Sequence, residues 1–196
     1  MAERYYPLGV QSFEDIIRNN FYYVDKTEQL YRLVKANKFV FLSRPRRFGK
    51  SLMINTLKSY FQGRKELFAG LKIEKLEQDW IEYPVIHLDM SVSMGDQMRL
   101  LYSMIDTEFK HYESIYGLSI SESEKDSFGD RLDRIMQAAN ERTDKQIVVL
   151  IDEYDAPMQE QITDPEMLEK VRNVLLNIYI KLKKNSPKIG RASCRE

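Results

Sequence analysis

Short apolar runs alternate along the chain with longer stretches in which apolar residues recur every three or four positions. The runs Lys38–Leu42, Pro84–Met90 and Ile147–Ile151 are short and rich in β-favouring residues, so each predicts a strand rather than a helix. The run Ile147–Ile151 is aliphatic throughout, which is typical of a strand buried on both faces in a parallel sheet. Strands that alternate with helices predict an α/β fold with a parallel sheet.

The stretches between these strands have helical spacing and recognisable helix starts. Asp25 is placed to cap a helix in which Leu30 and Val34 share one apolar face. The pair Asp164-Pro165 begins another helix, which should end near Asn185, because proline is favoured in the first turn. The other predicted helices begin near Ser12 or cover about 52–61, 96–116 and 122–139.

The composition narrows the class of protein without identifying a function. The chain has 196 residues, of which 30 are basic and 30 acidic, and 43% are hydrophobic, so wholesale disorder is excluded. Cys194 is the single cysteine, which excludes a disulfide scaffold. There is neither a signal-peptide core nor an apolar run of the ~20 residues that a bilayer requires. We therefore expect a cytoplasmic protein without a membrane partner, and the neutral net charge gives no general reason to expect nucleic acid.

The loop after the first predicted strand ends in Gly49-Lys50-Ser51. A phosphate-binding loop (Walker A) needs a strand, a tight turn that exposes N–H groups, a lysine, and a hydroxyl that opens a helix. In this interpretation Gly49 lets the backbone approach the phosphate, Lys50 neutralises the β- and γ-phosphates, and Ser51 ligates Mg²⁺. The first glycine of the pattern G-x-x-x-x-G-K-[ST] is replaced by Arg44, so the loop alone also fits an ordinary strand–helix turn.

Two acids, Asp152 and Glu153, follow the aliphatic strand Ile147–Ile151 directly. Phosphoryl-transfer sites need one carboxylate to position Mg²⁺ and a second group to polarise the attacking water (Walker B). We interpret Asp152 as the metal residue, acting through the water shell of the cation, and Glu153 as the catalytic base. Solvated acids at a strand end are the alternative, but the two elements together favour a site for ATP and Mg²⁺.

Four segments of the chain resemble the bacterial AAA-ATPase-like family. They are Tyr23-Val24-Asp25-Lys26-Thr27, Arg44-Pro45-Arg46-Arg47-Phe48-Gly49-Lys50-Ser51, Tyr83-Pro84-Val85-Ile86 and Ile151-Asp152-Glu153-Tyr154-Asp155-Ala156-Pro157. The resemblance extends over Leu8 to Lys188 and implies that arginine at position 44 is usual. It also implies that nucleotide is bound by Arg44, Pro45, Arg46, Arg47, Phe48, Gly49, Lys50 and Ser51.

The last residues stand apart from this resemblance. Ile189–Glu196 resembles one reading frame of a common sequencing-library adapter, so we expect residues 1–188 to form the P-loop domain and 189–196 to lie outside the fold. The family resemblance implies a strand with a polar sensor residue between the phosphate-loop strand and the metal-site strand, and then a PD-(D/E)XK nuclease-type domain. By position that strand follows the helix that ends near Asn185, so we expect a P-loop NTPase-type parallel sheet that lacks both.

These features support an ATPase coupled to an attached nuclease-like effector, with nucleic acid as a partner of that effector. The alternative is a nucleotide-sensing or nucleic-acid-binding module without turnover, because Arg44, Arg46 and Arg47 could clamp phosphates or bind nucleic acid. A third hypothesis is that this piece of chain is inactive because its sheet is incomplete. His87 and His111 lack partners at metal-ligand spacing and are predicted to be structural. The oligomeric state cannot be predicted.

Overall fold

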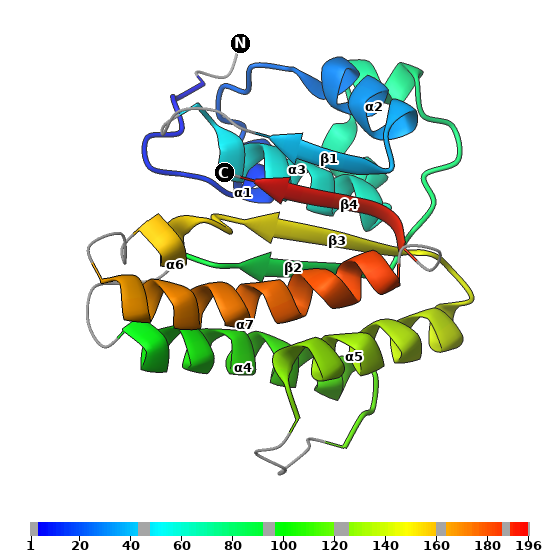
Figure 1. Cartoon of the computed structure of the whole chain (residues 1–196). Helices are drawn as coiled ribbons and strands as arrows, with labels where there is room; N and C mark the ends of the chain where they lie inside the picture. Colours follow the sequence, from blue (N-terminus) through cyan, green and yellow to red (C-terminus); the bar gives the residue numbers. More distant parts are fainter. Residues whose placement is uncertain are drawn as a thin grey trace.

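The computed structural model describes residues 4–42, 48–91, 97–119, 126–159, 164–185 and 189–195. In these ranges a parallel four-stranded sheet has helices on both faces, and all its arrows point the same way in Figure 1. The strand order is β1-β4-β3-β2, with bounds β1 (Phe39–Leu42), β2 (Val85–Asp89), β3 (Ile147–Asp152) and β4 (Ile189–Arg195). The predicted α/β class with a parallel sheet between helices is confirmed.

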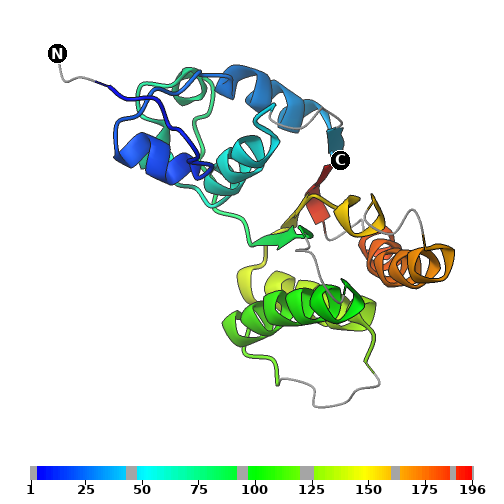
Figure 2. The same ribbon diagram turned by 90° about the vertical axis from the view of Figure 1, so that its left-hand side faces the viewer.

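One face of the sheet is covered by three long helices, shown from green to orange in Figure 2. They are α4 (Gln97–Ile115), α5 (Phe128–Thr143) and α7 (Pro165–Lys184). Their apolar stripes enclose a core in which Phe109, Ile135 and Ile178 are fully buried against Val149 and Ile151 of β3. The predicted helical segments 96–116 and 165–185 therefore form because each has one face to bury.

The opposite face is covered by smaller elements, shown from blue to teal in Figure 2. They are α1 (Phe13–Arg18), α2 (Thr27–Ala36), α3 (Lys50–Phe61) and the 3₁₀ turns η1 (Lys65–Phe68) and η2 (Lys72–Lys75), while α6 (Ala156–Gln159) follows β3. Ile54 and Leu57 of α3 pack in one core with Val148 and Leu150 of β3. Successive residues of β3 thus enter opposite cores, which confirms that this strand is buried on both faces.

Asp25 fixes the start of α2 and also fastens it to η2. One carboxylate oxygen accepts hydrogen bonds from the N–H and the hydroxyl of Thr27, and the other accepts from the N–H of Lys72 at 2.8 Å. The Thr27 hydroxyl in turn accepts from the N–H of Ile73 at 3.1 Å. The N-cap position of α2 is Lys26, so Asp25 lies one residue before the predicted place, although its carboxylate still accepts the N–H of the first helical residue, Thr27. The Asp25-Lys26-Thr27 segment has a second, tertiary role in holding a distant turn.

The starts of α5 and α7 follow from their capping residues. The Ser127 side chain accepts from the N–H of Asp130 at 3.2 Å, so α5 begins at Phe128, later than the predicted start near Glu122. Asp164 caps α7 immediately before Pro165, as predicted.

The expectation that the position between β1 and β3 is empty is wrong. Ile189–Arg195 forms β4 there, with Ala192 paired to Phe39 on one side and to Val149 on the other. A parallel ladder is made by main-chain N–H and C=O groups, so its formation depends little on which side chains the strand has. An empty position would leave those groups unpaired on both neighbouring strands, at a cost in free energy. Residues 189–195 thus belong to the sheet, and the adapter origin of this segment stays a prediction.

Removing residues 189–196 should deprotect β1. In the described part of the chain β1 pairs with β4 alone, whereas β3 also pairs with β2. We expect amide exchange in Phe39–Leu42 to approach that of a frayed segment, while Val148–Ile151 keep most of their protection. Hydrogen-exchange mass spectrometry on the two chain lengths measures this difference. Unchanged protection in Val40–Leu42 after the deletion would contradict the pairing.

A buried ion network joins α4 to α5. The guanidinium group of Arg131 donates to both carboxylate oxygens of Glu113, at 2.8 and 2.9 Å, and to Asp106 at 2.6 Å. It also lies over the ring of Phe109, with 5.5 Å to the centroid. Glu113 is 1% exposed and Arg131 is 8% exposed, so water stabilises neither charge well. Each charge is compensated mainly by its partner.

Replacing Arg131 with Met should therefore destabilise the fold strongly. The substitution leaves Glu113 buried without its cation, and we expect the free energy of unfolding to fall by about 3–5 kcal/mol. Arg134→Met is the matched control on the same helix, because the ion pair of Arg134 with Asp126 is exposed and contributes at most about 1 kcal/mol. Urea unfolding of both variants tests the difference, and equal losses would refute it.

Candidate functional site

The carboxyl ends of β1 and β3 lie at one level of the sheet. Leu42, the last residue of β1, pairs with Arg195 of β4, and Ile151 of β3 pairs with Cys194. One residue further along, Asp152 is level with Arg195 and hence with Leu42. Two strand spacings separate them, which is about 10 Å. The sheet therefore brings the end of the loop strand and the acidic strand end to one edge.

The helix that follows β1 presents an uncapped N-terminus at this edge. Gly49 is the N-cap residue of α3 with φ +70°, and in the described part of the chain no side chain caps the helix. Apart from its chain neighbours, no atom of the described residues lies within 4 Å of where a Cβ on Gly49 would be. The first turn contains Lys50 and Ser51 and has no acidic residue. The N–H groups and the positive dipole end of a helix start attract anions, so this turn is suited to a phosphate.

The acidic strand end faces the same side of the sheet. Asp152 alternates with Val148 and Leu150, which pack against α3, so its side chain lies on the α3 face. It is 4% exposed, a burial that carboxylates accept only with compensating partners.

Glu153 occupies a strained turn directly after β3. Its φ is +50°, in the left-handed region that costs an L-residue with a Cβ free energy. Its carbonyl accepts from the N–H of Ala156 at 3.1 Å, and this turn leads into α6. Such strain persists only where the surroundings hold it, and it is concentrated at functional sites.

A ring contact ties the acidic turn to the strand before the loop. Tyr154, next to Glu153, lies with its ring 5.6 Å from the ring of Phe41 in β1 and 6.3 Å from that of Tyr179 in α7. Because β4 lies between β1 and β3, the contact with Phe41 reaches across β4. The two ring contacts together link the turn to β1 and to α7.

The predicted site residues divide into two groups. The carboxyl edge described above contains Gly49, Lys50 and Ser51 at the start of α3, and Asp152 at the end of β3 with Glu153 directly after it. Phe48 is beside them and is 61% exposed. The other predicted nucleotide-binding residues lie outside the described residues: Arg44, Pro45, Arg46 and Arg47.

These residues fit a nucleotide accompanied by Mg²⁺. The donor set is a hydroxyl and a buried carboxylate, both oxygen ligands that Mg²⁺ accepts. Among the described residues, no group of three or more His, Cys, Asp or Glu side chains is arranged to hold a metal. Mg²⁺ in nucleotide sites keeps several waters and takes one or two protein carboxylates plus phosphates, so the few protein ligands here are compatible with it.

Sequence reasoning missed Asp89. It ends β2 and is the register partner of Asp152. The signal was available, because the apolar run Pro84–Met90 contains an acid, Asp89, next to its end, as the run Ile147–Ile151 is followed by Asp152.

The two histidines take no part in this edge. Burial lowers the pKa of His87 to about 4, so the imidazole is neutral at physiological pH. Its main-chain N–H donates to the Tyr112 hydroxyl at 2.7 Å, which closes part of the outer edge of β2. His111 contacts the ring of Tyr112. That both histidines are structural stays a prediction.

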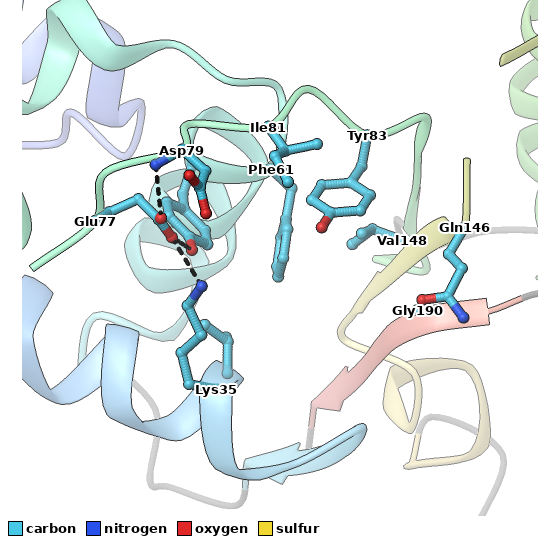
Figure 3. A pocket seen from close by; sticks show the side chains of 11 residues that line it. Lys35, Phe61, Glu77, Asp79, Ile81, Tyr83, Gln146, Val148 and Gly190 are labelled. Carbon is cyan, nitrogen blue, oxygen red and sulfur yellow. Dashed lines mark hydrogen bonds and ion pairs between the residues drawn. The ribbon is translucent and has the colours of Figure 1, made fainter. Parts of the chain in front are cut away.

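A cavity of about 120 Å³ lies at the opposite, amino end of the sheet (Figure 3). Its walls include Phe61, Tyr83 and Gln146, and the carboxylate of Glu77 lies on one side. Glu77 accepts hydrogen bonds from the Tyr60 hydroxyl, from Lys35 at 3.1 Å and from two main-chain N–H groups. Burial alone would raise the pKa of Glu77, but these donors outweigh it and lower the pKa. The carboxylate is thus satisfied internally and braces α2, α3 and the following loop.

The sheet and its carboxyl edge are consistent with a partial P-loop domain. The chain belongs to the predicted AAA-ATPase family, because the family model described as "Predicted AAA-ATPase" matches residues 7–194. The resemblance seen in the sequence is thereby confirmed. In the ranges that the structure describes, no helix has the length and apolarity to cross a membrane.

The chain is also similar to a curated protein of Azotobacter chroococcum mcd 1, described as "Uncharacterized protein in vnfD 5'region". The two are 34% identical over 186 residues, which is 93% of this chain and 35% of that protein. The chain thus spans about a third of the length of this relative. No solved structure matches.

Replacing Glu153 with Gly should stabilise the protein. Glycine adopts positive φ without a Cβ penalty, so we expect the free energy of unfolding to rise by about 1 kcal/mol. Asp144→Gly is the matched control, because Asp144 also has positive φ, 51°, but lies after α5 at the amino end of β3, whereas Glu153 follows the carboxyl end of that strand. Aspartate tolerates this conformation better than glutamate, so the gain there should be smaller. A loss of stability in Glu153→Gly, measured by thermal unfolding, would contradict the strain.

Proposed function

We propose that the carboxyl edge of the sheet binds ATP with Mg²⁺ and that the complete protein hydrolyses it. The observation that supports this proposal is the convergence of an uncapped helix start, with Lys50 and Ser51, and a buried acid, Asp152, at one edge. In open α/β sheets, ligands bind outside the carboxyl ends of the strands. The family to which the chain belongs points to the same activity.

Each side chain has a distinct role in this proposal. The N–H groups of the α3 start and the ammonium group of Lys50 bind the phosphates. Ser51 and Asp152 hold Mg²⁺, which neutralises developing charge on the transferred phosphoryl group. Glu153 orients and polarises the attacking water, as a carboxylate next to the metal residue is placed to do.

In the longer protein, we propose that nucleotide state is coupled to an attached nuclease-like domain. The relative's greater length leaves room for such a domain, and the family resemblance implies one. A role for Arg44, Arg46 and Arg47 in binding nucleic acid has no support from the described residues, so we treat it as an outcome of the test below.

The proposal is tested first by binding. Lys50→Ala should weaken Mg²⁺-dependent uptake of a fluorescent ATP analogue by about tenfold to a hundredfold, because a charge-assisted contact is lost. Lys58→Ala, on the same helix, is the control and should bind like the parent. Glu153→Gln should still bind, and in the complete protein it should release phosphate about 10²–10⁴-fold more slowly.

Three results would overturn the proposal in different parts. If Lys50→Ala binds the fluorescent ATP analogue as the parent does, the start of α3 does not bind the phosphates. If Glu153→Gln releases phosphate at the parent rate, Glu153 is not the catalytic base. Absent turnover together with DNA binding that weakens steeply with salt would support the nucleic-acid module instead.

A further inference from the structure

Asp89 and Asp152 lie side by side on the adjacent strands β2 and β3. Their Cα atoms are register partners in the parallel pairing of β2 with β3. Val85 of β2 packs in the α3-side core, and Asp89 lies four residues further along the same strand, so it points to the same face. Both carboxylates therefore lie on the α3 side of the carboxyl edge, where Lys50 and Ser51 begin α3.

This arrangement places two like charges opposite one another. Like charges directly opposite one another on neighbouring strands destabilise a sheet. Asp152 is 4% exposed, so water screens its charge weakly. Among the described residues Asp89 forms no ion pair that would offset the repulsion. A cation between the two strands' ends would be attracted by both carboxylates.

Among the described residues, the one hydrogen bond of the Asp89 side chain does not require an acid. Its Oδ1 accepts from the N–H of Ser91 at 2.9 Å, which orients the side chain at the strand end. An asparagine would accept the same bond, because its Oδ1 is also an acceptor. The negative charge of Asp89 is therefore left without a structural task, and its other oxygen is available at an exposed position.

We propose that Asp89 is a positioning residue for Mg²⁺, the second carboxylate at the cation site of Asp152. This inference rests on the proposed function and extends it to a residue, Asp89, that lies outside the four family segments of the sequence. Mg²⁺ gives up its waters reluctantly and is held by one or two carboxylates, so an acid can act on it through the hydration shell. Asp89 thus adds negative charge for the cation, and the adjacent Asp152 holds it.

The substitution Asp89→Asn separates the proposed role of the charge from the hydrogen bond between the Asp89 side chain and the N–H of Ser91. The variant keeps the acceptor for the Ser91 N–H and loses only the charge. Its unfolding temperature without ligand should therefore be the same as that of the parent or slightly higher. Its affinity for the fluorescent ATP analogue should fall about tenfold or more in Mg²⁺ and be unchanged in EDTA, since partners of metal ligands typically contribute 10–100-fold to metal affinity. Asp79→Asn, an exposed acid at the amino end of the sheet, should change neither quantity.

A second readout uses the cation alone. Millimolar Mg²⁺ or Mn²⁺ without nucleotide should raise the unfolding temperature of the parent, and Asp89→Asn should lose this shift. Cation stabilisation that is lost in Asp89→Asn, in a protein that binds no ATP, would support the cation role and refute the proposed function. Parent-like Mg²⁺ dependence of the variant would overturn the inference while leaving ATP binding intact. A lowered unfolding temperature without ligand would also overturn it, because the acid would then be structural.

Discussion

The parallel ladder through β4 is the constraint on which the rest of this structure depends. It sets the level of β1 against β3, and with it the distance between the start of α3 and the acidic turn. Side-chain packing reinforces this arrangement: α3 packs directly on β3, and Tyr154 contacts Phe41 across β4. Packing alone tolerates sliding, whereas a hydrogen-bonded register does not, because a slip of one residue turns every side chain to the other face. The site geometry is therefore a property of the backbone.

That dependence explains what could and could not be predicted from the sequence. Elements with a strong apolar pattern were predicted well, such as the buried run Ile147–Ile151 and the helix after Asp164. β4 was missed because the resemblance of Ile189–Glu196 to an adapter placed this segment outside the fold, whereas main-chain pairing depends little on the identity of its side chains. The start of α5 was displaced because one capping bond from Ser127 decided it. Periodicity shows which face is buried, but not which strands are neighbours.

The candidate site follows the same division. Lys50, Ser51, Asp152 and Glu153 were found because their neighbours along the chain form patterns that phosphate chemistry requires. Asp89 was not, since its meaning comes from a partner about 60 residues away in the sequence that the sheet places beside it. The left-handed turn at Glu153 was equally invisible, because nothing but the fold forces a glutamate into a conformation that glycine adopts more easily.

Charge is distributed along the strands in a way that distinguishes their two ends. At the amino end, the carboxylate of Glu77 accepts hydrogen bonds from Tyr60, Lys35 and main-chain donors. Its negative charge is therefore compensated within the protein and attracts a ligand in the nearby cavity only weakly. Between α4 and α5, Arg131 and Glu113 likewise satisfy each other. The carboxyl end instead places acids on two adjacent strands opposite a helix start that contains no acid. A ligand that joins negative phosphates to a divalent cation is complementary to that end, because its two charges meet the helix start and the acids separately.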